Sequence, residues 1–199
     1  MGTKLTLDDI ADLRAYERER DAFRARIIEL KKARRVSIGP IVTMVFENRD
    51  TIRFQIQEMA RAERMLSDDA IQTELDTYNP LIPGAGELSA TLFIELTSKD
   101  QLVEWLPKLV GVERSLELLL GEGAGAEVVR CEVEEQHAEQ LTREDVTASV
   151  HYVRFRLTPS QVERFASEPV VLAVNHANYA EGAHLGDETK RALLEDLRG

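Results

Sequence analysis

The sequence predicts an α+β fold in which a mainly antiparallel sheet carries long N-terminal helices packed on one face. Two observations support this prediction. Helical periodicity dominates residues 1–80, where apolar side chains recur every three or four positions. About six strand-length segments occur in the chain, five of them after residue 80, many joined by short loops and some separated by helices. Because 199 residues can form one sizeable core, we expect a single domain over residues 1–199, with a helical subdomain at 1–80 as the alternative.

The first long helix is expected from about Leu13 to Arg35, after a short capped helix that begins at Thr6. Its apolar seam has one gap, which Arg20 fills. Arg20 therefore either lies at the core edge with its charge in water, or pairs with a carboxylate, or faces a ligand. We expect the basic run that ends at Arg35 to be a solvated helix terminus. The seam consists of Leu13, Tyr16, Phe23, Ile27 and Leu30.

A buried strand is expected at residues 41–46, where a β-branched and apolar run follows Gly39-Pro40. Two helices should come next, followed by a loop at 79–86 that contains two prolines and two glycines and is the candidate subdomain boundary. The two helices are expected at about 49–66 and 69–78. Later elements are expected as strands at 87–96, 115–120, 126–133, 146–157 and 169–175, helices at 100–109, 159–166 and 187–197, and a loop at 176–185.

Composition excludes several classes of protein. The net charge of −11 argues against general binding of nucleic acid or of an anionic membrane, since both need a positive surface. No apolar run approaches the roughly 20 residues that cross a bilayer, and the N-terminus lacks a signal-peptide pattern, so we expect a cytoplasmic protein. Cys131 is the only cysteine, which excludes a disulfide within one chain. Residues 1–35 carry ten Lys/Arg against seven Asp/Glu, an excess that would let the first helix dock on an acidic surface of its own domain or of a second subunit.

The helix at 49–66 holds the densest set of arginine, glutamine and glutamate side chains. On a helical wheel, one side forms an apolar stripe and the opposite quadrant is polar. Glu63 falls inside the apolar stripe, where a carboxylate must be paired, hydrogen-bonded or protonated. The stripe contains Ile52, Ile56, Met59 and Leu66, and the polar quadrant contains Asp50, Arg53, Gln57, Arg61 and Arg64.

Two interpretations of this helix stay open. In the structural one, Glu63 or Glu58 pairs with an arginine such as Arg20 and fixes how the first two long helices cross. In the functional one, the polar quadrant faces a cleft that holds an anionic ligand through bidentate hydrogen bonds, with the next loop closing the cleft. The candidate ligand-binding residues are Arg20, Arg49, Arg53, Gln57, Glu58, Arg61, Glu63, Arg64, Tyr78, Asn79 and His176.

Other motifs carry less information. Two Glu-x-x-His pairs, Glu134/His137 and Glu181/His184, lie in segments expected to be loops, so we predict no metal site from them. His176 follows a strand, where a histidine either performs acid/base chemistry or pairs locally. The glycine-rich run at 121–125 lacks the lysine and hydroxyl residue of a phosphate loop, and no nucleophile elbow, zinc-protease motif or dinucleotide fingerprint occurs.

Three stretches of the chain, Phe46–Met59, Glu74–Gly84 and Gly86–Leu92, resemble a bacterial family of about this length that is known as a domain of unknown function. The resemblance covers nearly the whole chain. The resemblance implies a conserved gene neighbourhood, because genes of this family often lie beside those for rubrerythrin-like di-iron proteins and iron–sulfur oxidoreductases. The family would have a proline after the C-terminal histidine, where this chain has Ala177, which weakens any role carried over onto His176.

From these observations we expect a non-enzymatic accessory or binding protein in redox or oxidative-stress physiology. It would recognise an anionic ligand or an acidic partner through the Arg/Gln helix face, and rubrerythrin-like or iron–sulfur proteins are the expected partners. The first alternative is an enzyme that acts on a small anionic substrate with the Arg/Glu/Gln cluster, aided by His176. The second alternative is a metalloprotein. The sequence leaves open any cofactor and whether the protein forms a homo-oligomer.

Overall fold

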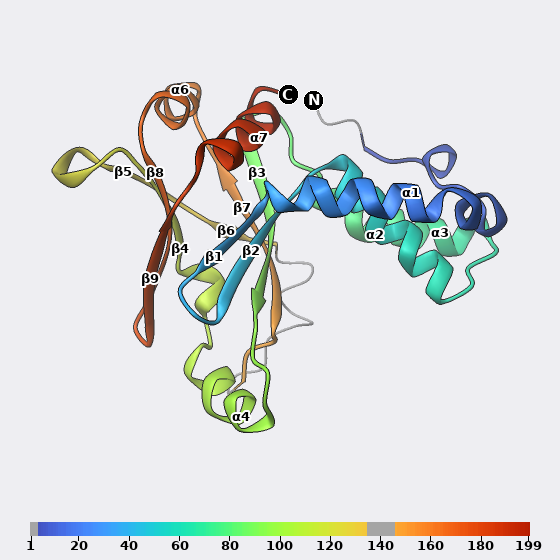
Figure 1. The fold of residues 1–199 in the computed structure, drawn as a ribbon, viewed down its shortest axis with the longest axis horizontal. Coiled ribbons are helices and arrows are strands. Elements are labelled where there is room, and N and C mark those ends of the chain that lie inside the picture. The colour runs from blue at the N-terminus through green and yellow to red at the C-terminus, as the bar shows by residue number, and fades with distance from the viewer. Residues whose placement is uncertain (1–3, 135–145) are drawn as a thin grey trace.

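The computed structural model describes residues 4–134 and 146–199. It has two parts: a body built from two antiparallel sheets, and an arm of three helices that projects from one side of the body (Figure 1). The α+β class and the antiparallel pairing agree with the sequence-based prediction. The described helices and strands total six α-helices and nine strands.

The arm is formed by helices α1, α2 and α3. Helix α1 runs from the distal tip towards the sheets, α2 runs back out to the tip, and α3 returns (Figure 1). A segment with one short 3₁₀ turn at Leu7–Asp9 precedes α1. The arm helices span Leu13–Lys32 (α1), Arg49–Ala62 (α2) and Asp68–Tyr78 (α3), and a 3₁₀ turn at Asn79–Leu81 follows.

The first sheet has the strand order β1-β2-β3-β7-β6, and the second has the order β5-β4-β8-β9. All neighbouring strands are antiparallel. The strands of the first sheet are Arg35–Ile38 (β1), Val42–Glu47 (β2), Glu87–Ile94 (β3), Glu132–Val133 (β6) and Val150–Arg156 (β7). Those of the second are Leu116–Leu120 (β4), Glu127–Arg130 (β5), Val170–His176 (β8) and Tyr179–His184 (β9).

The two sheets join at both edges into a flattened barrel. At one edge the chain passes directly from β5 to β6 through Cys131, so that one extended segment belongs to both sheets. At the other edge the phenol of Tyr179 on β9 donates a hydrogen bond of 2.5 Å to the Ile38 carbonyl of β1. Gly39 follows with φ +66°, and a Cβ there would lie 2.4 Å from this phenol oxygen, so only glycine fits at this seam.

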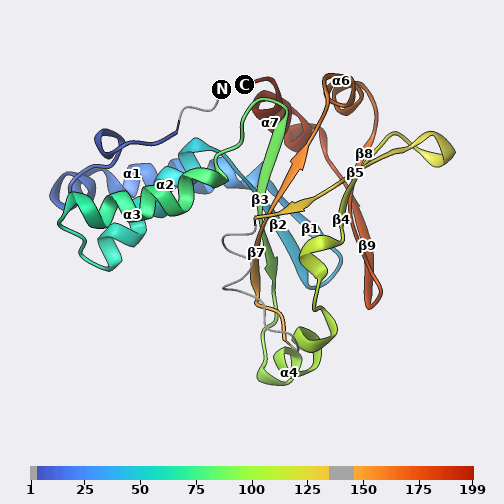
Figure 2. The ribbon, with the colours of Figure 1, turned by 180° about the vertical axis from the view of Figure 1, so that it is seen from behind.

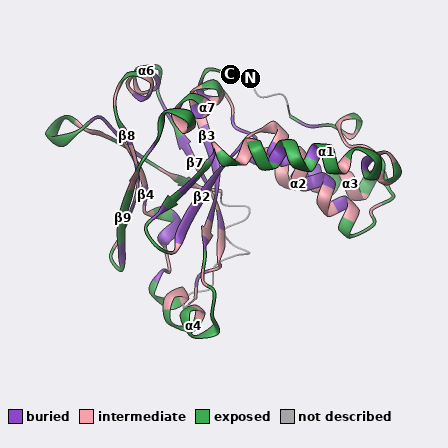
Figure 3. Cartoon of the chain, viewed as in Figure 1, coloured by how far each residue is buried: buried purple, intermediate pink, exposed green. Residues whose placement is uncertain are grey.

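The barrel interior is one apolar core that draws side chains from both sheets. Helix α4 lies at one end of the barrel, and α6 and α7 lie at the other, as both views show (Figures 1 and 2). The burial colouring separates the purple strands of the core from the largely green and pink outer surface of the arm (Figure 3). The end helices span Lys99–Lys108 (α4), Pro159–Ser167 (α6) and Asp187–Arg198 (α7).

Several expected boundaries are wrong. Helix α1 ends at Lys32, and strand β1 occupies residues expected to be helical or connecting, because Val36 and Ile38 face the core. Arg34, expected in a solvated helix end, is 3% exposed and pairs with Asp196 of α7. The segment expected as a loop at 176–185 contains strand β9, which pairs with β8. Val103, an apolar residue of α4, is 69% exposed. The expected polar connection at 134–144 lies almost wholly outside the described residues.

Candidate functional site

Three side chains of α2, each four positions from the next, bind the segment that precedes α1. The Arg49 guanidinium donates to the Asp9 carboxylate at 2.6 Å, and Arg53 Nε donates to the Asp9 carbonyl at 2.7 Å. Gln57 accepts from the Ala11 N–H at 3.0 Å and donates to the Ala11 carbonyl at 2.8 Å. Residues four apart lie on the same helix face, so this face binds the protein's own chain as one continuous strip.

Gln57 is fully buried, which distinguishes it from the arginines beside it. Its amide oxygen and nitrogen together satisfy both backbone groups of Ala11. A buried backbone group without a partner is costly, so this pairing makes the route of the N-terminal segment specific. Gln57 therefore has a structural partner and is not directed at a free cleft.

Glu58 binds two residues of α1. Arg20 donates from Nε and Nη2 to the two carboxylate oxygens, each at 2.8 Å, and the Tyr16 hydroxyl donates to Oε1 at 2.6 Å. The hydrogen bonds from Arg20 are the main cause that lowers the pKa of Glu58. Burial, together with the hydrogen bond to Glu58, raises the pKa of Tyr16. The structural interpretation of the sequence is thus confirmed for Arg20 and Glu58, which fix the crossing of α1 and α2.

Glu63 is exposed, contrary to the expectation that it lies in the apolar stripe. The reason is that α2 ends at Ala62. Arg64 adopts φ +54°, and the N–H of Met65 bonds the Ala60 carbonyl at 2.9 Å, which is the hydrogen bond of a Schellman helix end. Past this point the helical period no longer applies, so Glu63 and Leu66 leave the stripe. Leu66 is 87% exposed.

The remaining arginines of the polar quadrant lie towards solvent. Arg61 donates to Glu17 of α1, with the two side chains 39% and 52% exposed. Arg64 is exposed at the helix end. Exposed ion pairs of this kind stabilise a protein by about 0–1 kcal/mol, so they exchange partners readily.

A concentration of positive charge surrounds Phe23, whose side chain packs between α1 and α2. The guanidinium carbon of Arg26 lies 4.9 Å from the centre of the Phe23 ring, and that of Arg53 lies 5.1 Å from it. The nearest carboxylate contact in this group is Glu19, at 3.8 Å from Arg53. Arg26 has no ion pair among the described contacts. We call Phe23, Arg26 and Arg53 the basic edge of the arm.

The loop after α3 holds the start of the chain. Asn79 accepts from the Leu5 N–H at 2.8 Å and donates to the Leu5 carbonyl at 2.9 Å, while its own carbonyl accepts from Lys4 at 2.6 Å. Tyr78 is half-buried, and burial raises its pKa. Both candidate residues from this loop therefore have partners within the arm or at its base.

A polar cluster that sequence reasoning missed lies where the arm meets the outer face of the first sheet. Glu47 is 3% exposed and accepts from Thr91 at 2.6 Å, yet its second carboxylate oxygen has no hydrogen-bond partner among the described residues. Tyr152 of β7 lies near Glu47 and hydrogen-bonds Gln55 and Tyr78. The sequence signal for this cluster was the placement of polar residues at every second position of strands that are otherwise apolar, because such residues share one face of the sheet. No described cleft opens onto this cluster.

His176 is the last residue of β8, a strand that lies across the body from the arm in both views (Figures 1 and 2). Its Nε2 lies 3.1 Å from the Val110 carbonyl, and its Nδ1 accepts from the Asn178 N–H at 3.2 Å. These are local pairings, and His176 does not join the side chains of α2. Glu181 and His184 are exposed on strand β9, where residues three apart point to opposite faces. His137 lies outside the described residues.

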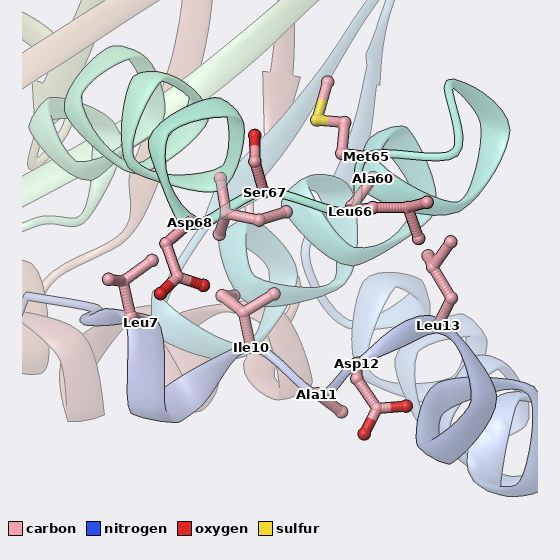
Figure 4. A pocket seen from close by; sticks show the side chains of 11 residues that line it. Leu7, Ile10, Ala11, Asp12, Leu13, Ala60, Met65, Leu66, Ser67 and Asp68 are labelled. Carbon is pink, nitrogen blue, oxygen red and sulfur yellow. The ribbon is translucent and has the colours of Figure 1, made fainter.

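Three of the clefts formed by the described residues bear on the candidate site. The tip cleft, of about 160 Å³, lies between the N-terminal segment and the α2–α3 connection (Figure 4). A cleft of about 280 Å³ lies beside the start of α2 and includes Arg49 and Asp50. A third, of about 330 Å³, lies near Leu157 and Leu197. Arg53, Gln57 and Arg61 line none of the three. Within residues 4–134 and 146–199, no group of three or more His, Cys, Asp or Glu side chains is arranged to hold a metal ion.

Fold and site together define a two-sheet α+β protein with a projecting, ion-paired helical arm. The chain belongs to the family described as "Protein of unknown function (DUF3501)", which matches residues 4–197. It is also similar to a protein of unknown function from Burkholderia pseudomallei K96243, whose crystal structure was determined at 1.90 Å. That likeness has 35% identity and a TM-score of 0.87, and covers 98% of this chain and 100% of the other. No curated protein matches the chain. Among the described helices, none has the length and apolar character to span a membrane.

Proposed function

We propose that this protein is a non-enzymatic accessory protein of a redox or oxidative-stress system, and that the basic edge of its arm recognises an acidic segment of a partner protein. The observation that carries this proposal is the pair of guanidinium groups, from Arg26 and Arg53, stacked on the single ring of Phe23. The one ion pair described for either guanidinium joins Arg53 to Glu19, at 3.8 Å. Acidic side chains of a partner would supply the missing negative charge.

The distribution of charge supports the choice of this edge. Residues 1–82 carry 15 Asp/Glu against 14 Lys/Arg, whereas residues 83–199 carry 21 Asp/Glu against 11 Lys/Arg. An acidic partner would be repelled by the body of this protein and would meet a nearly neutral arm, whose basic edge supplies the favourable charge. The exposed pair of Arg61 with Glu17 could open towards such a partner at little cost, since exposed ion pairs contribute about 0–1 kcal/mol.

The geometry favours a binding role over the enzyme alternative. An enzyme that used the Arg/Glu/Gln cluster would bring these groups together in a concave site. Instead, Glu58 and Arg20 bind each other, and Gln57 binds the backbone of Ala11. The proposed link to redox physiology rests on the gene neighbourhood that the family resemblance implies. We therefore expect the partner to be a rubrerythrin-like or iron–sulfur protein.

The test is to measure binding to a rubrerythrin-like protein from the same organism, using titration calorimetry at two salt concentrations. We expect binding that weakens as salt increases, because the contact is electrostatic. Arg26→Glu should weaken binding at least tenfold. Arg18→Glu is the matched control: Arg18 is an exposed arginine of the same helix, whose only described hydrogen bond is to the Arg14 carbonyl. Absence of binding, or equal loss in both variants, would contradict the proposal.

A further inference from the structure

The tip of the arm presents an apolar side chain to solvent in a fixed position. Leu66 is 87% exposed, the highest value among the large apolar side chains identified as exposed. It follows the left-handed residue Arg64, and the hydrogen bond from Met65 to Ala60 closes the turn. Ser67 then caps α3 by accepting from the Ala70 N–H. Hydrogen bonds therefore fix the backbone before and after Leu66. The turn itself holds the Leu66 side chain exposed.

Leu66 stands at the edge of the tip cleft, whose walls come from the N-terminal segment, the start of α1, the end of α2, the α2–α3 connection and the start of α3. Figure 4 shows the side chain of Leu66 near Leu13, with Leu7 and Ile10 on the other side of the opening. A space of about 160 Å³ is similar to an apolar cavity of about 150 Å³ that holds a benzene-sized group. The cleft therefore fits one aliphatic or small aromatic side chain. Its apolar lining includes Leu7, Ile10, Leu13, Met65, Leu66 and Ile71.

The charge around the cleft has a single sign. Asp12 and Asp68 are its only ionisable lining residues, and both are exposed. Asp12 accepts one hydrogen bond, from the Ala15 N–H at 2.9 Å, and Asp68 lies in the first turn of α3. No lysine or arginine lines the cleft. A cation placed at the rim of the apolar opening would therefore find carboxylates in the cleft lining and no positive side chain there.

We propose that the tip cleft docks a partner segment in which one aliphatic side chain lies next to a lysine or arginine. The aliphatic group would enter the cleft and cover Leu66, and the cation would lie at the rim of the cleft beside Asp68. This site has the opposite charge preference to the basic edge, and it involves different residues. It therefore stands independently of the proposed function, and failure of either leaves the other in place.

A second copy of the chain is the main competing occupant, and charge argues against it. In a two-fold contact the same surface patch faces itself, so the carboxylates of each tip would meet those of the other. Like charges placed opposite one another weaken association. An aliphatic segment flanked by cations has the complementary charge instead.

The experiment uses the full chain and two synthetic peptides, Ac-Ser-Lys-Leu-Lys-Ser-NH₂ and its counterpart with glutamate in place of both lysines. Methyl-labelled leucine and isoleucine residues are followed by NMR during titration. We expect the lysine peptide to shift the methyl signals of Leu66, Leu13 and Ile71, and the glutamate peptide to bind at least tenfold more weakly. Leu66→Ser should weaken binding of the lysine peptide at least fivefold, and Asp68→Asn should reduce the preference between the two peptides.

Val103→Ser is the matched control, because Val103 is an exposed apolar residue at 69% on the distant helix α4. It should leave peptide binding unchanged, and thermal unfolding of each variant checks that the fold is retained. Equal binding of the two peptides, or no shift at the cleft methyl groups up to millimolar peptide, would overturn the proposal. Shifts that depend on protein concentration without peptide would also overturn it, since they would assign the tip to self-association.

Discussion

The body and the arm of this protein are stabilised by different kinds of contact. In the body, one cluster of 27 buried apolar side chains joins both sheets and the helices at the barrel ends. In the arm, the buried apolar side chains fall into two clusters of six and three. Partly buried polar contacts also join the parts of the arm, including Gln57 with Ala11 and Glu58 with Tyr16 and Arg20.

This difference shows how a small apolar interface can still define one geometry. Apolar burial is non-directional and scales with area, so a large core needs little help from individual polar groups. A helix pair with few apolar contacts can slide or rotate unless hydrogen bonds of fixed direction hold its register. The polar residues that make the arm resemble a binding site in the sequence are, in large part, those that hold its helices in place.

The largest effect is expected from Phe155→Ala, in the body. Phe155 is fully buried in the shared core, and truncation of a buried phenylalanine lowers the free energy of unfolding by about 3–5 kcal/mol. Calorimetry should show a lower Tm, and hydrogen exchange should increase in both body and arm. Val103→Ala, an exposed control, should change stability by less than about 0.5 kcal/mol. A second transition that retained the original Tm would show instead that the arm is an independent unit.

A smaller, local effect is expected from Glu58→Gln. The variant keeps the size of the side chain but removes the charge that binds Arg20, with an expected loss of about 1–2 kcal/mol for charged hydrogen bonds at a half-buried position. Hydrogen exchange should increase in α1 and remain slow in β3. Because Arg20 lowers the pKa of Glu58, this stabilisation is present above the ordinary value near 4.5 and is lost as pH falls through the folded pKa.

Glu63→Gln is the control for that prediction, because Glu63 is an exposed carboxylate at the end of the same helix. It should leave the exchange rates of α1 unchanged. If both variants loosened α1 equally, general electrostatics would account for the effect, and the specific pair with Arg20 would not.

A pH-dependent effect is expected from His151 in the body. This side chain is 1% exposed, and burial lowers its pKa, although the charge of Glu113 acts in the opposite direction. The unfolded chain takes up the proton near pH 6.5 and the folded chain at lower pH, so stability is full above about 6.5 and decreases as pH falls towards the folded pKa. The slope is at most about 1.4 kcal/mol per pH unit. Chemical denaturation between pH 7.5 and 5.5 should show a flatter dependence for His151→Gln than for the exposed control His184→Gln.

The smallest effect, a gain, is expected from Arg64→Gly at the tip of the arm. The left-handed conformation costs a residue with a Cβ about 1–2 kcal/mol, and glycine loses about 0.5–1 kcal/mol through its freedom in the unfolded chain. The free energy of unfolding should rise by about 0.5–1 kcal/mol, measured by denaturant titration. Arg18→Gly, in the middle of α1, should lower it by a similar amount. A loss of stability in Arg64→Gly would mean that the arginine side chain makes a stabilising contact.

The sequence was sufficient for the fold class and for most element positions, because the periodicity of apolar residues is a local signal. The apolar seam of α1 and the alternation in β3 are examples. Strand β9 was missed because only Tyr179 in it has a strong strand preference, whereas alanine, glycine and glutamate are depleted in strands. Its conformation comes from pairing with β8 across a two-residue turn, and that pairing leaves no pattern within β9 itself.

The candidate site was predictable only where both partners are side chains. The pair of Arg20 with Glu58 was indicated because Arg20 interrupts the apolar seam of the first long helix and Glu58 lies on the next helix. The pairing of Gln57 with Ala11 could not be read in this way, because the partner is backbone and any residue offers the same groups. Glu63 was misplaced because the end of α2 depends on Arg64 in a conformation usually taken by glycine.

The pairing of Leu5 and Lys4 with Asn79 has a consequence for how the protein is made. These contacts connect the two ends of the arm's sequence, which are about 75 residues apart along the chain. During synthesis, the N-terminal segment can form these hydrogen bonds only after Asn79 has emerged from the ribosome. Every residue that forms these contacts is nevertheless translated before strand β3 begins at Glu87, so the arm can close while most of the barrel has yet to be made.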